Sequence, residues 1–465
     1  MLLPSLVGWT AVAFLTAASA QAKTILHISD VHLNITLDQM HYGFDSSPRL
    51  LDSALSYARS VLRNPDLLLY TGDAVAHTKH NESVLATSVR AGIDMLESYF
   101  QVKNVTAILG NADCLHDYEF YITDPKNGTN PTIGMVDEPW KKSLTRSQFN
   151  QFDTRGYLLY QIEPKLILIT LNTVPYSIKH SPDTKHLDDP FDQFVWLRAT
   201  LDETRRNGSF AYITGHIPPI IDSYKGESQW NLKYILSYKA IVQDFPDIIK
   251  AQLFGHVHSI EYRVPVENLD GLLGVPLFAS GAISPFFGNN PSFTIWEYDA
   301  DTYDLTDFSV FATNFSVAGS DVLDWKKIFT ATTLYNLSSI SSKSLRELTQ
   351  RMKADDTLLH EYYRHSKADT RRLTPCDTTD CLDRVLCAQT WFESEEEYQQ
   401  CVDDRGLERA GAPDLVETVP RVSWFWALLV SAVAAALLSG LIVFLHRVLK
   451  RSTYMSLRTP MHFVP

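Results

Sequence analysis

The sequence is poor in positive charge and in cysteine, and no internal repeat divides it. Its 465 residues carry 41 Lys and Arg against 54 Asp and Glu, which gives a formal net charge of -13. A chain with this balance offers no broad basic surface for nucleic acid, so a nucleic-acid-binding function is disfavoured. The hydrophobic share of 45% is ordinary for a globular protein and is large enough for a sizeable core.

The N-terminus lacks Lys and Arg before residue 23, yet it has the pattern of a signal peptide at residues 1–22. An apolar stretch at residues 6–15 runs into small residues, with an A-x-A cleavage site ending at Ala20 or Ala22. A cytosolic N-terminal helix is the alternative interpretation. Secretion is the prediction that the small residues favour.

Charged residues are also absent from residues 424–445, near the other end. This run is long enough to cross a bilayer as a helix. Basic residues follow it in the tail at 446–465, which predicts a cytosolic tail and a single-pass type I membrane protein. Residues 406–423 show no periodicity and are expected to link the span to a catalytic domain that faces the lumen of the secretory pathway, in a vacuole- or lysosome-like compartment, or the outside of the cell. Asn-x-Ser/Thr sequons, the acceptors of N-glycans, all precede the span: Asn34, Asn81, Asn104, Asn127, Asn207, Asn314 and Asn336.

Four of the five cysteines lie in one short segment, at positions 376, 381, 387 and 401. In an oxidising lumen they are expected to form two disulfides, for which three pairings are possible. A zinc knuckle is the rival interpretation, and the irregular spacing disfavours it. The remaining cysteine, Cys114, is either a buried free thiol or a reactive one.

Apolar, β-branched runs alternate with helical patterns over residues 24–320, which predicts an α/β sandwich with substantial parallel pairing. Helical patterns occupy residues 53–62 and 88–100, and a more helical segment at 321–405 contains the cysteine cluster. The predicted strands are residues 24–28, 67–71, 105–109, 166–171, 210–214, 251–254 and 293–298.

Side chains that bind metals follow five of these runs. They are Asp30 and His32 in HISDVH, Asp73 in YTGDAVAH, Asn111 in LGNAD, His216 in TGHIPP, and His256 and His258 in FGHVH. Ligands of open α/β sheets gather beyond the carboxyl ends of strands, so these side chains are expected to meet. A glycine precedes most of them, which permits a sharp turn and a close approach of the backbone. Carboxylate, imidazole and amide ligands suit two divalent cations, preferably Zn²⁺.

Any one of these motifs alone is weak, but the ordered set resembles the calcineurin-like metallophosphoesterase superfamily. Within it, the chain is similar to the acid sphingomyelinase-like phosphodiesterases over about residues 24–405. It lacks the saposin-like domain of acid sphingomyelinase itself, which makes it more similar to the shorter sphingomyelinase-like members. The resemblance implies a metallophosphoesterase β-sandwich flanked by helices at 23–320 and a small disulfide-bonded helical subdomain at 321–405.

The resemblance also implies roles for the seven residues. One cation would be held by Asp30, His32 and His258, and a second by Asn111, His216 and His256. Asp73 would bridge the two. Cations held in this way supply hydroxide that attacks phosphorus in line. His77, at the end of the Gly-Asp-x-x-x-His motif, would shape the site or touch the phosphate, although an ordinary loop histidine fits the sequence equally well.

The chain departs from the resemblance at Ala112, where sphingomyelinase-like members carry a histidine that is thought to protonate the leaving group. His116, four residues on, is the candidate replacement. At this loop the chain resembles the vacuolar endopolyphosphatases, whose phosphoanhydride substrates need less protonation. The leading hypothesis is a phosphodiesterase acting on a phospholipid head group or a nucleotide. An endopolyphosphatase and a catalytically weak ectodomain with a binding or signalling role are the alternatives.

Overall fold

The computed structural model describes residues 22–410 except residues 79, 101–104, 267–273, 316–322, 371 and 373–374. No helix within these described residues is long and apolar enough to cross a membrane. The predicted signal peptide (apart from residue 22), the span at 424–445, the tail at 446–465 and most of the linker lie outside the described residues. The type I topology therefore stays a prediction.

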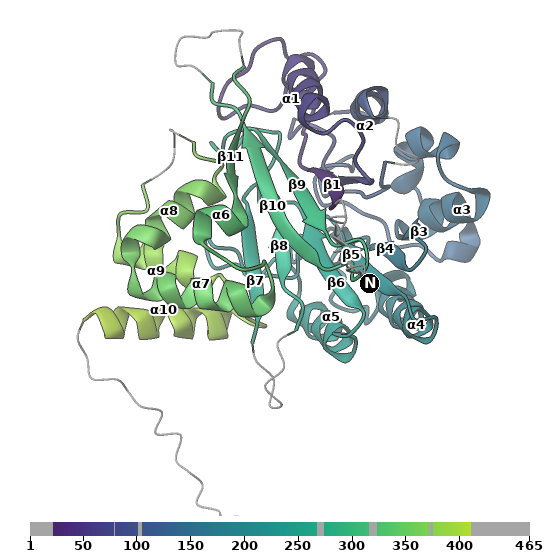
Figure 1. Ribbon diagram of the computed structural model, residues 1–465. Coiled ribbons are helices and arrows are strands. Elements are labelled where there is room, and N and C mark those ends of the chain that lie inside the picture. The colour runs from purple at the N-terminus through teal and green to yellow at the C-terminus, as the bar shows by residue number, and fades with distance from the viewer. Residues whose placement is uncertain are drawn as a thin grey trace, which may run out of the picture. The chain divides into compact units, whose positions relative to one another are not determined.

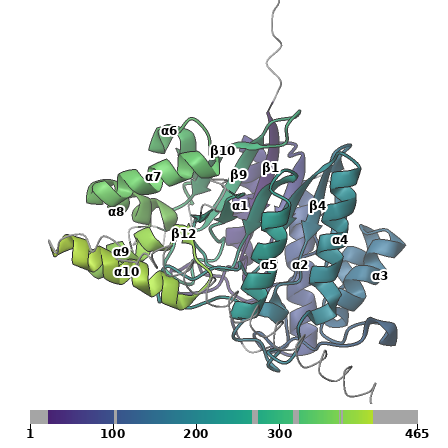
Figure 2. The same ribbon diagram turned by 90° about the horizontal axis from the view of Figure 1, so that it is seen from below.

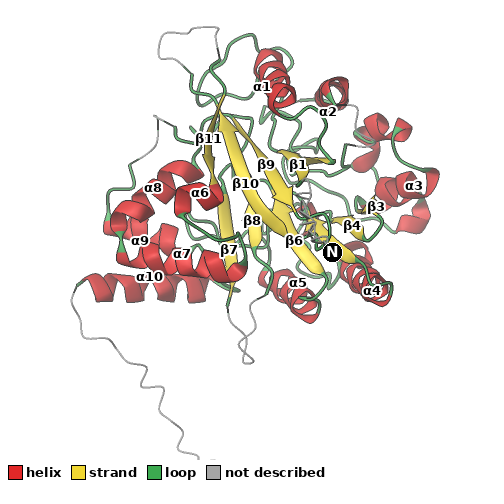
Figure 3. Ribbon diagram, viewed as in Figure 1, coloured by secondary structure: helices red, strands yellow, loops and turns green. Residues whose placement is uncertain are grey.

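Two mixed β-sheets form the centre of the molecule (Figures 1 and 3). The five-stranded sheet has the order β11-β10-β9-β1-β2, and the seven-stranded sheet has the order β12-β7-β8-β6-β5-β4-β3. The strands of the first sheet are β1 (Lys23–Ile28), β2 (Leu67–Tyr70), β9 (Ser292–Tyr298), β10 (Leu305–Ala312) and β11 (Lys326–Thr330). Those of the second are β3 (Leu158–Glu163), β4 (Leu166–Thr170), β5 (Phe210–Thr214), β6 (Ile249–Phe254), β7 (Glu261–Pro265), β8 (Leu277–Ala279) and β12 (Thr390–Trp391).

The strands that carry the site motifs run parallel to one another within each sheet. Strand β1 pairs in parallel with β2, and β4, β5, β6 and β8 form a parallel run. Aromatic side chains join the two sheets: the ring centroids of Phe278 on β8 and Trp296 on β9 lie 5.1 Å apart. The predicted α/β sandwich with substantial parallel pairing is confirmed.

Helices cover the outer faces of the sheets (Figure 2). Helix α1 starts at Pro48, a residue whose ring suits the first helical turn, and the Ser47 side chain accepts the N–H of Leu50 as its cap. Asn81 caps α2 in the same way, through the N–H of Val84. The helices of this part are α1 (Pro48–Val61), α2 (Glu82–Tyr99), α3 (Arg146–Arg155), α4 (Gln193–Arg206) and α5 (Leu232–Asp244).

One predicted strand is wrong. Residues 105–109 form no strand, because hydrogen bonds of side-chain hydroxyls replace the backbone pairing that a strand beside β2 would make. The hydroxyl of Thr106 accepts the N–H of Tyr70 and donates to its carbonyl. The N–H of Ala107 donates to the hydroxyl of Tyr160. The segment still lies beside β2 and carries Asn111 to the same edge as the real strands.

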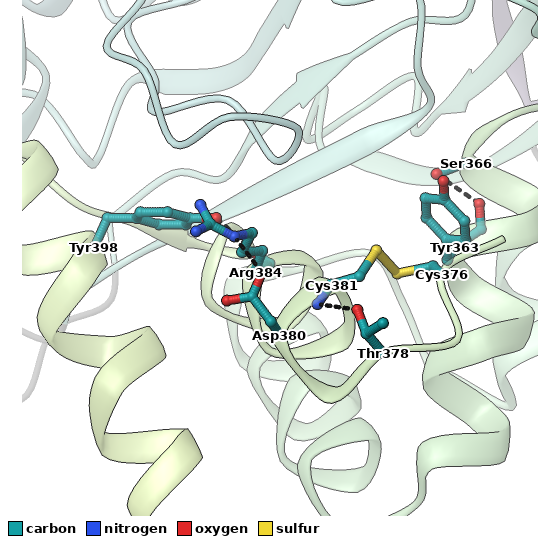
Figure 4. Close-up of a disulfide and its surroundings, with 8 residues drawn as sticks. All are labelled: Tyr363, Ser366, Cys376, Thr378, Asp380, Cys381, Arg384 and Tyr398. Carbon is teal, nitrogen blue, oxygen red and sulfur yellow. Dashed lines mark hydrogen bonds and ion pairs between the residues drawn. A yellow bond between two sulfur atoms is a disulfide. The ribbon is translucent and has the colours of Figure 1, made fainter. Parts of the chain in front are cut away.

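The later part of the chain is helical and disulfide-bonded, as predicted. Its pairings are Cys376–Cys381 (Figure 4) and Cys387–Cys401, which exclude the zinc-knuckle interpretation. Cys114 is buried and free, so the first of its two interpretations applies. The helices are α6 (Ala331–Tyr335), α7 (Ser342–Ala354), α8 (Asp356–Ser366), α9 (Thr379–Cys387) and α10 (Glu395–Arg409).

Candidate metal centre

The carboxyl ends of four strands and one extended segment bring the seven predicted side chains together. Asp30 and His32 follow β1, and Asp73 follows β2. His216 follows β5, His256 and His258 follow β6, and Asn111 follows the segment at 105–110. All of them are buried except His256, which is half-buried. Buried carboxylates and imidazoles in one cluster are a costly arrangement unless a partner offsets their charge and lone pairs.

The cluster has two halves. In the first, the Nε2 atoms of His32 and His258 lie 3.2 Å apart, and Nε2 of His258 lies 3.4 Å from a carboxylate oxygen of Asp30. In the second, Nε2 of His216 lies 3.0 Å from Oδ1 of Asn111 and 3.3 Å from Nδ1 of His256.

Asp73 lies between the two halves. Its Oδ2 atom is 3.4 Å from Nε2 of His32 and 3.1 Å from Nε2 of His216. Its other carboxylate oxygen accepts the N–H of Ala112. A single carboxylate oxygen therefore faces both sets of ligand atoms.

The hydrogen bonds of two histidines leave the correct nitrogen free for a cation. Nδ1 of His32 lies 2.9 Å from the carbonyl oxygen of Val75, and Nδ1 of His216 lies 2.8 Å from that of Thr71. A carbonyl only accepts, so each Nδ1 carries a proton and each neutral ring directs the Nε2 lone pair into the cluster. These residues fit a pair of divalent cations.

Burial also keeps two of the imidazoles neutral. It lowers the pKa of His32 to about 4 and that of His256 to about 3. Burial lowers the pKa of His216 too, but the Asp73 carboxylate outweighs it and raises that pKa to about 9. A proton on His216 therefore competes with a cation for the same nitrogen, because a metal ligand must be deprotonated.

The backbone of the site is strained, as active-site backbones often are. Five of the seven residues have positive φ angles between 44° and 72°: Asp30, His32, Asp73, His256 and His258. Two of the preceding glycines are required by close packing. A Cβ atom on Gly110 would lie 1.9 Å from Oδ1 of Asp73, and one on Gly255 would lie 2.1 Å from Oγ of Ser29.

Comparison with known proteins identifies the family. Residues 23–259 match the calcineurin-like phosphoesterases, and residues 279–408 match the acid sphingomyelin phosphodiesterase C-terminal region. The chain belongs to the calcineurin-like phosphoesterase family. Its second matched region includes the disulfide-bonded helices, so this phosphoesterase has the two-part organisation of the acid sphingomyelinase type.

Three relatives of this phosphoesterase are themselves named as phosphodiesterases. Sphingomyelinase phosphodiesterase D of Dictyostelium discoideum is 26% identical over 69% of this chain and 73% of its own. Acid sphingomyelinase-like phosphodiesterase 3b of Mus musculus is 25% identical over 83% and 91%. Cyclic GMP-AMP phosphodiesterase SMPDL3A of Homo sapiens is 26% identical over 74% and 77%. The chain is accordingly a metal-dependent phosphodiester hydrolase.

His77 of this phosphoesterase lies beside the cluster. Its ring stacks on His32 at 3.9 Å between centroids and on Phe286 at 4.2 Å. Nδ1 of His77 lies 2.7 Å from a carboxylate oxygen of Asp45, whose other oxygen accepts the backbone N–H of His77. Burial lowers the pKa of His77, but its bond to Asp45 outweighs burial and raises that pKa above the ordinary value.

His116 lies apart from the cluster. Its side chain is 72% exposed, and its nearest charged partner is Glu119 at 3.8 Å. Within the described residues, the His116 side chain forms no hydrogen bond or ion pair with any of the seven. Ala112 is buried, and its methyl group supplies no proton donor. The acid role of His116 stays a prediction.

Two residues that hold the cluster were missed by the sequence reasoning. Both carboxylate oxygens of Asp113 accept backbone N–H groups from the loop after β2 and from Gly110. This residue is visible in the sequence as the last of LGNAD. Asp45, the partner of His77, lies 32 residues before it in a loop and has no such signal.

Proposed function

We propose that Asp30, His32 and His258 hold one divalent cation, that Asn111, His216 and His256 hold a second, and that Asp73 bridges them. The observation that carries this assignment is the position of the Asp73 Oδ2 atom, which faces ligand nitrogens of both halves within 3.4 Å. A ligand set rich in imidazole favours Zn²⁺. The reaction is hydrolysis of a phosphodiester.

When bound, such a pair of cations polarises a phosphoryl group and lowers the pKa of water to the neutral range. The protein holds the reacting groups in place around them. The Asn111 amide is kept in position by its donation to Asp117 at 2.7 Å. Because Nδ1 of His77 is committed to Asp45, its other ring nitrogen is the atom left to contact a phosphoryl oxygen.

The aromatic residues beside the cluster favour a diester with an apolar or aromatic substituent. Phe287 is 66% exposed, and its ring meets the edge of His258 at 4.8 Å. A nucleobase stacks on such a ring, and a lipid chain packs against it. The substrate class is therefore a phospholipid head-group ester or a nucleotide diester, in line with the named substrates of the relatives.

Phosphoanhydride hydrolysis is the second candidate, and Ala112 is the observation that favours it. A phosphoanhydride leaves as a weakly basic phosphate and needs little protonation, whereas an alkoxide leaving group needs a proton donor. An endopolyphosphatase would tolerate an alanine at this place. A substrate panel separates the two candidates.

The test uses the purified protein with Zn²⁺ against sphingomyelin, cyclic GMP-AMP, bis-nitrophenyl phosphate and long-chain polyphosphate. Turnover of a diester, its loss with a chelator and its return with Zn²⁺ are expected. Turnover of polyphosphate alone would favour the second candidate. A protein that binds zinc and turns over none of the four would favour a binding or signalling role.

The catalytic part is proposed to face a lumenal or extracellular space. The two disulfides of the later, helical part of the chain support this placement, because such bonds persist in oxidising compartments. Glycosidase treatment of the protein from its natural source tests it. A shift in mass is expected if the sequons carry N-glycans, and an unchanged mass would count against the lumenal placement.

A further inference from the structure

His256 is oriented by a side chain, in contrast to His32 and His216. Its Nε2 atom lies 3.0 Å from Oε1 of Gln229. The amide orientation of Gln229 is determined, because its Nε2 donates to Oδ2 of Asp222 at 3.1 Å and to the carbonyl of Glu227 at 3.3 Å. Both of those partners only accept, so the oxygen of Gln229 must face His256.

This contact decides which nitrogen of His256 can bind a cation. An amide oxygen requires a donor, so Nε2 of His256 carries the proton and Nδ1 carries the lone pair. That Nδ1 atom is the one that lies 3.3 Å from Nε2 of His216. The hydroxyl of Tyr118 also approaches Nε2, but at 3.5 Å it is the longer contact.

Gln229 belongs to the loop at residues 217–230. The C-terminal helical region, which comprises helices α6 to α10 and the short strand β12 between α9 and α10, contacts this loop at several points. The indole N–H of Trp391 donates to the carbonyl of Pro219 at 2.7 Å. A carboxylate oxygen of Glu395 accepts the N–H of Ser228 at 2.8 Å. The first contact lies near the start of the loop, and the second lies one residue before Gln229.

The middle of the loop packs on the same region. Ile221 shares a small apolar cluster with Cys387 and Tyr398, next to the Cys387–Cys401 disulfide. Gly226 lies so close to Tyr398 that a Cβ atom would come within 2.7 Å of its ring. Arg384, which lies beside Tyr398 in Figure 4, donates to the carbonyl of Lys225 at 3.4 Å.

We propose that Gln229 is a positioning residue for the His256 side of the metal centre, and that the C-terminal helical region acts on the centre by holding the 217–230 loop that carries Gln229. This inference rests on the proposed function, since it requires His256 to be a metal ligand. It assigns the disulfide-bonded region a part in metal binding at one of the two sites.

The test is a Zn²⁺ titration by calorimetry of the metal-stripped wild type and of Gln229→Met, which keeps the side-chain length but has no oxygen. The wild type is expected to bind two Zn²⁺ ions per chain. In Gln229→Met, the affinity of one site should fall by about 10–100-fold, as is typical when the partner of a metal-binding histidine is removed. The other site should keep its affinity.

The matched control is Gln252→Met. Gln252 is also buried, and its amide forms two hydrogen bonds, with Tyr238 and Val275, where that of Gln229 forms three. Neither of the two partners of Gln252 is among the seven residues. Both variants should lose a similar amount of thermal stability, and only Gln229→Met should lose a site. Equal Zn²⁺ affinities in the two variants would overturn the role of Gln229.

A double variant tests the direction of the hydrogen bond. Gln229→Glu combined with Asp222→Asn keeps an oxygen facing Nε2 of His256 and reverses donor and acceptor between the side chains of residues 229 and 222. It also removes the donor to the carbonyl of Glu227 and the acceptor of the Glu227 N–H, so its melting temperature is measured beside its affinity. It should recover the lost site to within a few-fold of the wild type. Failure to recover, in a variant that melts as the wild type does, would contradict the assigned tautomer.

The contact of the C-terminal helical region with the 217–230 loop is tested with Trp391→Phe, which removes the hydrogen bond to the carbonyl of Pro219 and keeps most of the packing. Its control is Trp325→Phe, because Trp325 also donates one bond, to Ser53, at a distant place. A few-fold loss of affinity at the same single site is expected for Trp391→Phe only. Equal Zn²⁺ affinities in the two Trp variants would overturn the role of the C-terminal helical region and leave only that of Gln229.

These outcomes remain distinct from failure of the proposed function. A wild type that binds no Zn²⁺ would overturn the two-metal centre itself. A wild type with two sites and an unchanged Gln229→Met variant would leave the centre in place and remove only this inference.

Discussion

The histidines of the site fall into two groups that differ in what orients them. His32 and His216 donate to the backbone carbonyls of Val75 and Thr71, at the end of β2. His256 and His77 instead depend on the side chains of Gln229 and Asp45. The first pair is oriented by atoms that every sequence with this fold possesses. The second pair is oriented by two particular residues, so a point mutation can release it without unfolding the sheets.

The difference extends to the parts of the chain that support each group. The carbonyls of Thr71 and Val75 are held by the strand ladder and by Asp113, which accepts the N–H groups of residues 73–75. Gln229 is held by a loop and by a separate helical region. Substitutions in the first support are therefore expected to reduce folding stability, and substitutions in the second to reduce metal affinity or turnover.

The largest effect is expected where the two halves of the site meet. Asp73→Asn removes the negative charge that faces both His32 and His216, so both cations should bind more weakly. Turnover should fall by more than about 100-fold, which is the largest loss that is typical when only the hydrogen-bond partner of a ligand is removed. Metal analysis and diester assays measure this. Full activity of the folded variant would end the bridged two-metal proposal.

The next largest effect is expected at Asp113, which supports the strand ends, and it should appear in folding stability. Asp113→Asn would place an amide N–H₂ against two buried backbone N–H donors, which lose their acceptor. We expect a loss of about 3 kcal/mol in the free energy of unfolding of the metal-free protein, measured by denaturant titration. Asp52→Asn is the control, because Asp52 is exposed and accepts a hydrogen bond from the hydroxyl of Tyr99, not from a buried backbone N–H. A loss no larger than that of the control would show that Asp113 does not stabilise the strand ends.

The site motifs could be predicted because each is local. An apolar run followed by Gly-Asp or Gly-His predicts both the end of a strand and a proposed ligand, and β2, β5 and β6 end within a residue of their predicted ends. The segment at residues 105–109 has the same pattern, yet two hydroxyls replace its backbone pairing: that of Thr106 bonds to the backbone of Tyr70, and that of Tyr160 accepts the N–H of Ala107. A run of apolar residues indicates that a segment is buried, but it does not indicate which hydrogen-bond partner each backbone group has.

The anchors of the second group could not be predicted from the sequence. Asp45 and Gln229 lie about 30 residues from the histidines that they hold, in loops without a repeating pattern. The disulfide pairing was equally hidden, since four cysteines allow three pairings. Which loop residue comes close to a histidine of the site depends on tertiary packing, such as the contact of Ile221 with Cys387 and Tyr398.

A smaller effect is expected from Asp45, the anchor of His77. Asp45→Ala frees the His77 ring, so turnover should fall by about tenfold while the zinc content stays at the wild-type value, because His77 is not among the proposed ligands. Asp45→Asn keeps one oxygen for Nδ1 and should lose less. Steady-state kinetics and metal analysis on both variants measure this. A joint loss of zinc and turnover would instead make Asp45 and His77 part of a metal site.

The smallest effect is expected from His116, whose side chain is 72% exposed. If it donates a proton to the leaving group, His116→Ala should lower turnover of alkyl diesters a few-fold and leave nitrophenyl diesters unchanged, because a good leaving group needs no acid. The ratio of the two rates is the measurement, and it is insensitive to a general loss of folded protein. An unchanged ratio would remove His116 from the reaction. The leaving group would then have to take its proton from solvent or from His77. Among the described residues, His77 is the one histidine outside the proposed ligands that packs against a proposed ligand, through its stacking on His32.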